Sequence, residues 1–224
     1  MKTIRESVLD DGYVELIDFM GDDNAPIDAA RVSFGKDSSQ FTDEQNDKLR
    51  RYLLKHHHET PFEMVTFKFR MRAPVVVWWH VVRHRIASYN FISGRYTEFA
   101  ETEVYKPTEW RQQSMDNKQG SDGLIDSEQW GDIFSNDRDA LYEDAFRLYA
   151  NMLRKGVARE QARLVLPFGA VYYDAIVQMN GRSLMNFLRL RTSGDAQSET
   201  RAYADAIKRI VQKTHPKTFE DQAS

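Results

Sequence analysis

The stretch that decides the fold is Val65-Thr66-Phe67-Lys68-Phe69-Arg70-Met71-Arg72, in which apolar and polar residues alternate without a break. Successive side chains of a β-strand point to opposite faces, so the alternation predicts one buried and one polar face. Pro74 ends the strand, because proline cannot donate the backbone hydrogen bond that a sheet requires. The sequence therefore predicts a half-buried strand at residues 65–72.

An apolar run, Val75 to Val82, follows directly. Its β-branched residues favour a strand, whereas a preceding proline is also typical of the first turn of a helix. Periodicity does not decide between the two in a run this short, so both remain open.

The rest of the chain predicts mixed helices and strands without internal repeats. Thr42-Asp43-Glu44-Gln45 is a capping box, which predicts the start of a helix. Polar residues and glycine dominate between Arg111 and Trp130, which predicts a loop of weak order. The other expected elements are strands at 13–19 and 171–179, and helices at 24 or 28 to 32, 137–155, 158–166, 183–190 and 199–213.

The composition predicts one domain over residues 1–224. With 41% hydrophobic content, this length suits one core and is too short for two large domains. A net charge of -3 provides no broad basic field, so no nucleic acid partner is expected. The polar N-terminal residues and the lack of an apolar run of roughly 18 residues predict a cytoplasmic protein without a membrane partner.

A basic cluster, Arg83 to Tyr96, holds three arginines, one histidine, two serines and one glycine. Guanidinium groups on a fixed scaffold bind phosphate through several N–H donors, and glycine lets a ligand approach the main chain. A run of arginines is more often a solvated surface. Here the valines and tryptophans upstream indicate a buried anchor, so we interpret the cluster as a site for a small anion.

His56-His57-His58-Glu59 is a second ionisable group. Consecutive residues on a helix diverge by about 100°, so these histidines do not share a face as metal ligands do. The preferred interpretation is a helix end that buries His56 and exposes two histidines, with no metal. Two other functions stay open: a metallohydrolase using His57, His58, Glu59 and His84, or a nucleotide- or RNA-binding module using Arg83 to Arg95 with Trp78, Trp79 and Tyr96.

Three motifs together resemble those of the flavin-dependent thymidylate synthases. They are Arg83-His84-Arg85 followed after seven residues by Ser93, His58-Glu59-Thr60-Pro61-Phe62-Glu63, and the segments Arg159–Pro167 and Asn180–Arg191. The resemblance runs in order from about Gly12 to about Phe219. It implies an α+β fold with a mainly antiparallel sheet flanked by helices, and a homotetramer with active sites at subunit interfaces.

The resemblance also implies the reaction. Members of the family convert dUMP to dTMP with methylenetetrahydrofolate as methylene donor, NADPH as reductant and FAD as hydride carrier. Matching positions for FAD are His58, Thr60, Arg83, His84, Arg85, Asn180, Arg182 and Asn186. Those for the nucleotide are His80, Arg83, Phe91, Ser93, Gly94, Arg95, Arg163 and Arg191. His80 and Phe91 stand where relatives usually carry glutamine or glutamate, so their side-chain contacts depart from the family pattern.

The chain contains no cysteine, which excludes the thiolate nucleophile of the unrelated thymidylate synthases. A cationic arginine beside the uracil ring would stabilise the negative charge that builds as carbon 5 becomes nucleophilic, and Arg191 is assigned this catalytic role. Arg189 and Arg191 also suit the ordinary use of arginine at a helix C-terminus. Ser93 has only His84 as a nearby base, so we assign Ser93 and Arg95 to phosphate.

Overall fold

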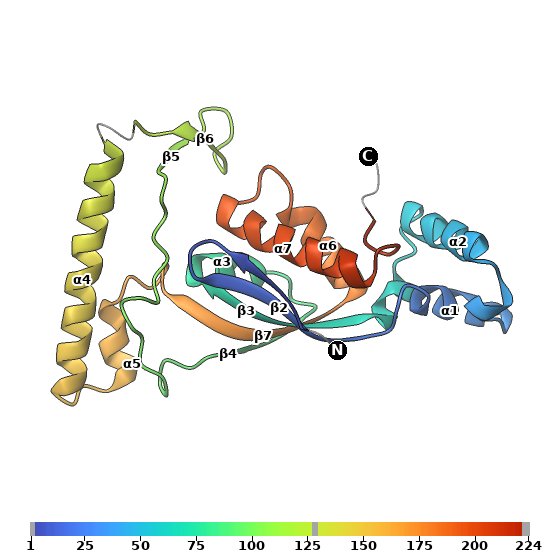
Figure 1. The fold of residues 1–224 in the computed structure, drawn as a ribbon, viewed down its shortest axis with the longest axis horizontal. Coiled ribbons are helices and arrows are strands. Elements are labelled where there is room, and N and C mark those ends of the chain that lie inside the picture. Colours follow the sequence, from blue (N-terminus) through green and yellow to red (C-terminus); the bar gives the residue numbers. More distant parts are fainter. Residues whose placement is uncertain (1–2, 127–129, 221–224) are drawn as a thin grey trace.

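A five-stranded sheet forms the centre of the fold (Figure 1). The computed structural model describes residues 3–126 and 130–220. The strands lie in the order β1-β2-β3-β7-β4, and every neighbouring pair is antiparallel. Their bounds are β1 Ile4–Val8, β2 Gly12–Met20, β3 Thr66–Pro74, β7 Tyr172–Asn180 and β4 Ser88–Phe91. The predicted α+β class with a mainly antiparallel sheet is confirmed.

The strand predicted from the alternating stretch is β3, the middle strand of the sheet. Phe67, Phe69 and Met71 are fully buried on one face, whereas Arg70 on the opposite face is exposed. The strand pairs with β7 along its whole length, from Thr66 opposite Asn180 to Pro74 opposite Tyr172. This register matters for the site, because it fixes where β7 ends and the helix after it begins.

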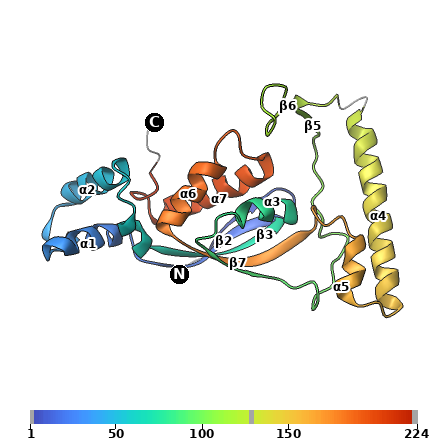
Figure 2. The same ribbon diagram turned by 180° about the vertical axis from the view of Figure 1, so that it is seen from behind.

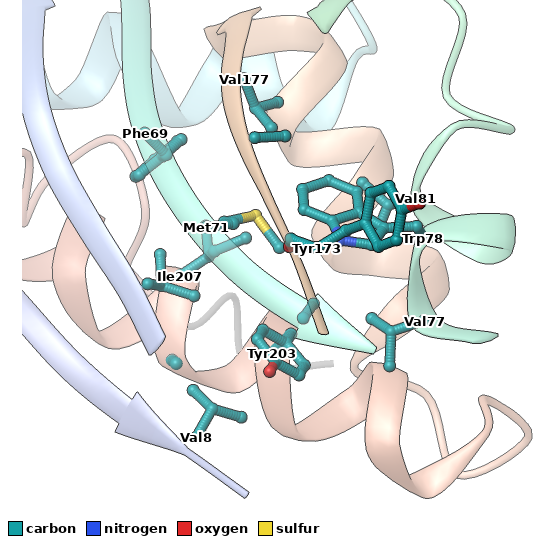
Figure 3. Close-up of a cluster of buried hydrophobic side chains, with 14 of the residues drawn as sticks. Val8, Phe69, Met71, Val77, Trp78, Val81, Tyr173, Val177, Tyr203 and Ile207 are labelled. Atoms are coloured by element: carbon teal, nitrogen blue, oxygen red, sulfur yellow. The ribbon is translucent and has the colours of Figure 1, made fainter. Parts of the chain in front are cut away.

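Helices α3 (Val75–Val81), α6 (Gly181–Arg191) and α7 (Ser198–Thr214) cover one face of the sheet, as the two opposite views show (Figures 1 and 2). Their apolar side chains and those of the strands form one core (Figure 3). The labelled residues of that core include Val8, Phe69, Met71, Val77, Trp78, Val177, Tyr203 and Ile207. The layers therefore follow from one apolar sheet face and three amphipathic helices.

The apolar run after Pro74 is a helix, which settles the alternative left open by the sequence. Pro74 is the N-cap residue of α3 and has an extended backbone, as a proline at a helix start allows. Val77, Trp78 and Val81 are buried at helical spacing, and Trp78 Nε1 donates a hydrogen bond to Tyr173 O at 3.0 Å. Tertiary packing and this hydrogen bond outweigh the strand preference of the valines.

The other helices lie toward the two ends of the sheet (Figure 1). Near one end are α1 (Ala25–Arg31), α2 (Asp43–Lys55) and the 3-10 turns Val32–Phe34, Ser38–Gln40 and Thr60–Met64, the last labelled η3. Toward the other end are α4 (Asp132–Arg154), α5 (Arg159–Ala162) and the 3-10 turn η5 (Arg163–Val165). The predicted capping box opens α2, with both reciprocal hydrogen bonds formed. No helix in the described ranges combines the length and apolarity needed to cross a bilayer.

The structure differs from two expectations for residues 111–155. Helix α4 begins at Asp132 rather than Asp137, and aromatic contacts stabilise its first turns, since Phe134 packs against Trp110 and Trp130. The expected loop between Arg111 and Trp130 contains a hairpin of β5 (Arg111–Gln113) and β6 (Ser121–Leu124). Residues 127–129 of that loop lie outside the described residues.

Three further features differ from expectation. Strands β1 and β4 were not predicted, because each is short and lies at an edge of the sheet, where few residues show alternation. His56, predicted to be buried, is exposed. Its ring rests on Tyr52, with ring centroids 4.3 Å apart, and Tyr52 is itself exposed, so this pair lies at the surface.

Candidate active site

A cavity of about 820 Å³ lies where η3, the segment after α3 and helix α6 meet. Seven of the residues predicted from the sequence line it: Arg83, His84, Arg85, Asn180, Arg182, Asn186 and Arg191. They come from two parts of the chain about 100 residues apart, which the β3–β7–β4 part of the sheet brings together. The structure therefore gathers most of the predicted cofactor residues, together with the predicted catalytic arginine, into one space.

The first turn of α6 explains how this helix presents its polar side chains. Asn180 is the N-cap residue, and its Oδ1 accepts the backbone N–H of Ser183 at 2.8 Å. A Cβ on Gly181 would lie 2.6 Å from Phe62 O, so glycine lets the helix approach η3 closely. Leu184 and Phe187 are fully buried, which leaves the opposite face of the helix for the cavity.

Arg191 is held by His84. Its Nε donates to His84 Nε2 at 3.1 Å, and an Nη2 atom lies 3.5 Å from His80 O. Burial first, and then the charge of Arg191, lowers the pKa of His84 to about 4, so the imidazole is neutral and accepts the hydrogen bond. The His84 ring also packs edge-on against Phe187. The guanidinium is thus held through Nε and Nη2 while it borders the cavity.

Arg182 is committed to protein carboxylates. Its Nε lies 3.2 Å from Glu59 and its Nη1 lies 2.7 Å from Glu63, both of them residues of the predicted His-Glu-Thr-Pro-Phe-Glu motif. The hydrogen bond that Arg182 donates to Glu63, opposed by a smaller burial effect, raises the pKa of Arg182. This ion-pair group ties α6 to η3 at the cavity wall, so Arg182 is less available to a phosphate than its position in the sequence implied.

The charge balance of the cavity suits an anionic ligand. Within residues 3–126 and 130–220, no carboxylate lies within salt-bridge distance of Arg83, Arg85, Arg189 or Arg191. The two carboxylates in the lining are those already paired with Arg182. Guanidinium groups without carboxylate partners around a space of this size fit the diphosphate and ring systems of a dinucleotide such as FAD.

His58 and Thr60 lie next to this cavity rather than in it. They line an adjoining cavity of about 570 Å³, which has apolar walls at Ala29, Ala30, Pro61 and Met64. His57, Glu59 and Arg182 line both cavities. The two spaces are therefore neighbours separated by the Arg182 ion-pair group.

The predicted nucleotide residues Ser93, Gly94, Arg95 and Arg163 form a second group elsewhere. Strand β4 leads away from the first cavity, with Ser88 opposite Gln178 and the N–H of Ile92 bonded to Asp174 O. At about 3.3 Å per residue, the two positions on β7, Gln178 and Asp174, are roughly 13 Å apart. A Cβ on Gly94 would lie 3.2 Å from Arg163 Nη1, which places Gly94 and Arg163 together. None of these four residues lines the cavity that contains Arg191.

The contacts of Ser93 and Arg95 are local. Ser93 Oγ accepts the N–H of Arg95 at 3.3 Å, and Ser93 O accepts the N–H of Tyr96. Arg95 lies 3.4 Å from Glu160. Phe91 packs edge-on against Trp78 with ring centroids 4.7 Å apart, so its side chain faces the core rather than a ligand. No histidine is bonded to Ser93 in the described chain, so the contacts give this hydroxyl no general base.

The structure adds residues that the sequence analysis did not assign to the cofactor or the nucleotide. His57, Glu63 and Arg189 line the first cavity. The sequence could have indicated Arg189, because its spacing of three from Asn186 places both residues on one face of α6. Among the described residues, no group of three or more His, Cys, Asp or Glu side chains is arranged to hold a metal ion, so the metallohydrolase interpretation lacks a ligand set in this part of the chain.

Comparisons with known proteins match nearly the whole chain. The model of a family described as thymidylate synthase complementing protein matches residues 15–217. A flavin-dependent thymidylate synthase of Kosmotoga olearia is 41% identical over 213 residues, or 95% of this chain and 90% of the relative. Another, from Thermus thermophilus, is 43% identical over 209 residues, or 93% of this chain and 74% of the relative. The crystal structure of a UMP/dUMP methylase PolB from Streptomyces cacaoi, bound with 5-Br dUMP, has a TM-score of 0.83 and 33% identity, and covers 96% of each chain.

The fold, the cationic cavity and these matches define an enzyme of the methyltransferase class. More particularly, the chain belongs to the flavin-dependent thymidylate synthase family, as the three motifs predicted. The metallohydrolase and the nucleotide- or RNA-binding module are not favoured by any of these comparisons. The individual roles of the site residues stay predictions.

Proposed function

We propose that this enzyme makes dTMP by reductive methylation of dUMP, with methylenetetrahydrofolate as carbon donor, NADPH as reductant and FAD as bound cofactor. The observation that carries the proposal is the cavity in which Arg83, Arg85, Arg189 and Arg191 face a common space without carboxylate partners among the described residues. The site belongs to one domain spanning the chain. The cytoplasmic location stays a prediction.

In this proposal the residues of the first cavity hold FAD and activate the uracil ring. Arg83 and Arg85 bind the diphosphate, and Asn186 and the α6 N-terminus at Asn180 orient the rest of the cofactor. FAD, when bound, supplies the hydride that completes the methyl group. Arg191 stabilises the negative charge that develops on the uracil ring, and His84 fixes the direction in which Arg191 points.

The second group of residues is proposed to hold the nucleotide phosphate. Ser93, Arg95 and Arg163 provide donors, and Gly94 lets Phe99 and Arg163 pack closely against the main chain beside them. Because this group is remote from Arg191 in one chain, we propose a homotetramer in which the two groups of one active site come from different subunits. Exposed apolar side chains on α4 and next to Arg163, including Leu141 and Leu164, are consistent with such contacts.

The test is an anaerobic assay of purified protein with FAD, NADPH and methylenetetrahydrofolate, run in parallel with dUMP and with UMP. The UMP arm is included because the similar PolB structure is described as a UMP/dUMP methylase. We expect dTMP, a flavin spectrum that bleaches with NADPH, and a tetrameric mass by light scattering. A colourless protein that forms no product from either nucleotide would refute the proposal, and stoichiometric bound metal would favour the hydrolase instead.

Variants separate the proposed roles. Arg191→Ala removes a charged donor from the reacting ring, so turnover should fall by about 100- to 1,000-fold while NADPH still reduces the flavin. Ser93→Ala removes one hydroxyl donor to phosphate, so it should mainly raise the KM for dUMP, by roughly tenfold. The opposite result, an inactive Ser93→Ala that binds dUMP beside an active Arg191→Ala, would indicate a serine nucleophile.

A further inference from the structure

The end of α2 places a histidine where glycine is the usual residue. His58 N–H bonds to Leu53 O at 2.8 Å and His57 N–H bonds to Leu54 O at 3.2 Å, which together form a Schellman motif. The residue that closes such a motif adopts a left-handed backbone, and His57 has φ of 54°. A Cβ is unfavourable in that conformation, which is why glycine is preferred there. His57 therefore strains the helix end.

Packing does not explain why a histidine occupies this position. Leu9 is the other non-glycine residue with positive φ in the described chain, and its side chain packs against the main core. By contrast, the His57 side chain is 86% exposed, and its nearest ionic partner is Glu59, whose Oε1 lies 3.7 Å from Nδ1. Glu59 already pairs with Arg182. The imidazole thus gives the fold little stabilisation in return for the strain.

Position gives a functional explanation. His57 lines both the cationic cavity and the adjoining cavity, at the junction between them. Beyond the junction, apolar side chains at Ala29, Ala30, Pro61 and Met64 share the wall with the polar residues Ser33, His58 and Thr60, which suits a flat heteroaromatic ring with polar edges. Strained residues persist where they serve a ligand, and an exposed imidazole at the mouth of such a space offers a stacking surface and a polar edge.

We propose that His57 is a ligand-binding residue that packs against the planar heteroaromatic ring of a ligand extending from the cationic cavity into the adjoining one. The inference rests on the proposed function, which supplies two ligands with such rings, FAD and methylenetetrahydrofolate. Both present the same chemistry to an imidazole. Binding measurements with each ligand distinguish the two sources.

The test uses the full-length enzyme and the variants His57→Gly and His57→Asn. Glycine removes the strain, so the Tm should rise by about 2 to 4 °C. Asparagine tolerates the left-handed backbone better than histidine and also removes the ring. Both variants should weaken the binding of one of the two ligands by roughly three- to tenfold. Fluorescence titration measures the FAD affinity, and the KM reports on the folate. His56→Asn is the matched control, because His56 is an exposed neighbour with φ of −98° that lines neither cavity.

A selective loss of FAD affinity would identify the flavin as the partner of His57, and a selective rise in the folate KM would identify the pterin. Unchanged values for both ligands, or the same loss in His56→Asn, would overturn the proposal. A Tm that does not rise in His57→Gly would overturn its premise of strain. FAD titration and Tm need no turnover, so a failure of the proposed reaction would be recognised separately by a wild-type enzyme that binds FAD and yields no product.

Discussion

The contact between His84 and Arg191 makes a quantitative prediction about catalysis. His84→Leu keeps the approximate volume of the side chain but removes the acceptor that lies 3.1 Å from Arg191 Nε. A hydrogen bond to a charged group is worth about 1.5 to 3 kcal/mol. If that energy holds Arg191 in its reactive orientation, kcat should fall by roughly 10- to 150-fold, since each 1.36 kcal/mol is a factor of ten.

The assay must separate ring activation from flavin chemistry. Rapid mixing of the reduced nicotinamide with the oxidised enzyme measures flavin reduction, and single-turnover formation of dTMP measures the later steps. We expect the second rate to fall and the first to stay within about twofold of wild type. His84→Gln is the matched control, because its amide oxygen restores an acceptor and should recover part of the lost rate. Equal losses in both rates, or no loss in His84→Leu, would refute the positioning role.

Three other predictions concern pH, cofactor and nucleotide. Burial, reinforced by Arg191, lowers the pKa of His84 to about 4, so as the pH falls the unfolded chain binds this proton before the folded protein does. The contribution of His84 to the free energy of unfolding should therefore be constant above about pH 7 and fall between about pH 6.5 and 4, by at most about 3 kcal/mol. Urea titrations over this pH range measure the change. Burial lowers the pKa of His215 as well, and His215→Asn should reduce the pH slope if that group contributes. Arg85→Ala should weaken FAD roughly tenfold to a hundredfold, and an unchanged fluorescence titration would remove Arg85 from the cofactor site. Gly94→Ala would place a Cβ 2.7 Å from the buried Phe99 and 3.2 Å from Arg163 Nη1, so the KM for dUMP should rise by about tenfold with FAD affinity unchanged.

Local patterns in the sequence were sufficient for most of the fold. The alternating stretch identified the middle strand, and the capping box at Thr42 identified the start of α2. These local patterns failed where contacts with distant parts of the chain determine the secondary structure. The run Val75–Val81 has β-branched residues on a helix because Val77, Trp78 and Val81 find a buried surface there. Strand β4 depends on pairing with β7, a partner about 85 residues away that no local pattern reveals.

For the site, too, the motifs identified some residues, whereas other relations became visible only in the three-dimensional structure. Three of the motif residues, Arg83, Asn186 and Arg191, line one cavity, while the ligands assigned to them stay predictions. The engagement of Arg182 by Glu59 and Glu63 was not foreseen, because an ion pair across 119 residues leaves no trace in spacing. The separation of Arg163 from Arg191 was also not foreseen, because it follows from the direction in which β4 runs.

That separation leads to the last prediction. If Arg191 and Arg163 of one active site come from different subunits, Arg191→Ala and Arg163→Ala inactivate different halves of the same site. In mixed oligomers some sites receive both intact arginines, and random equimolar mixing should restore activity to about a quarter of wild type. Mixing Arg191→Ala with His84→Leu is the control, because these residues touch within one chain and cannot complement. Its activity should stay at the mean of the two variants. If the Arg163→Ala mixture, refolded or co-expressed with Arg191→Ala, behaved like this control, each chain would have to build its own site, and the segment from Ser93 to Arg95 would have to move to reach Arg191.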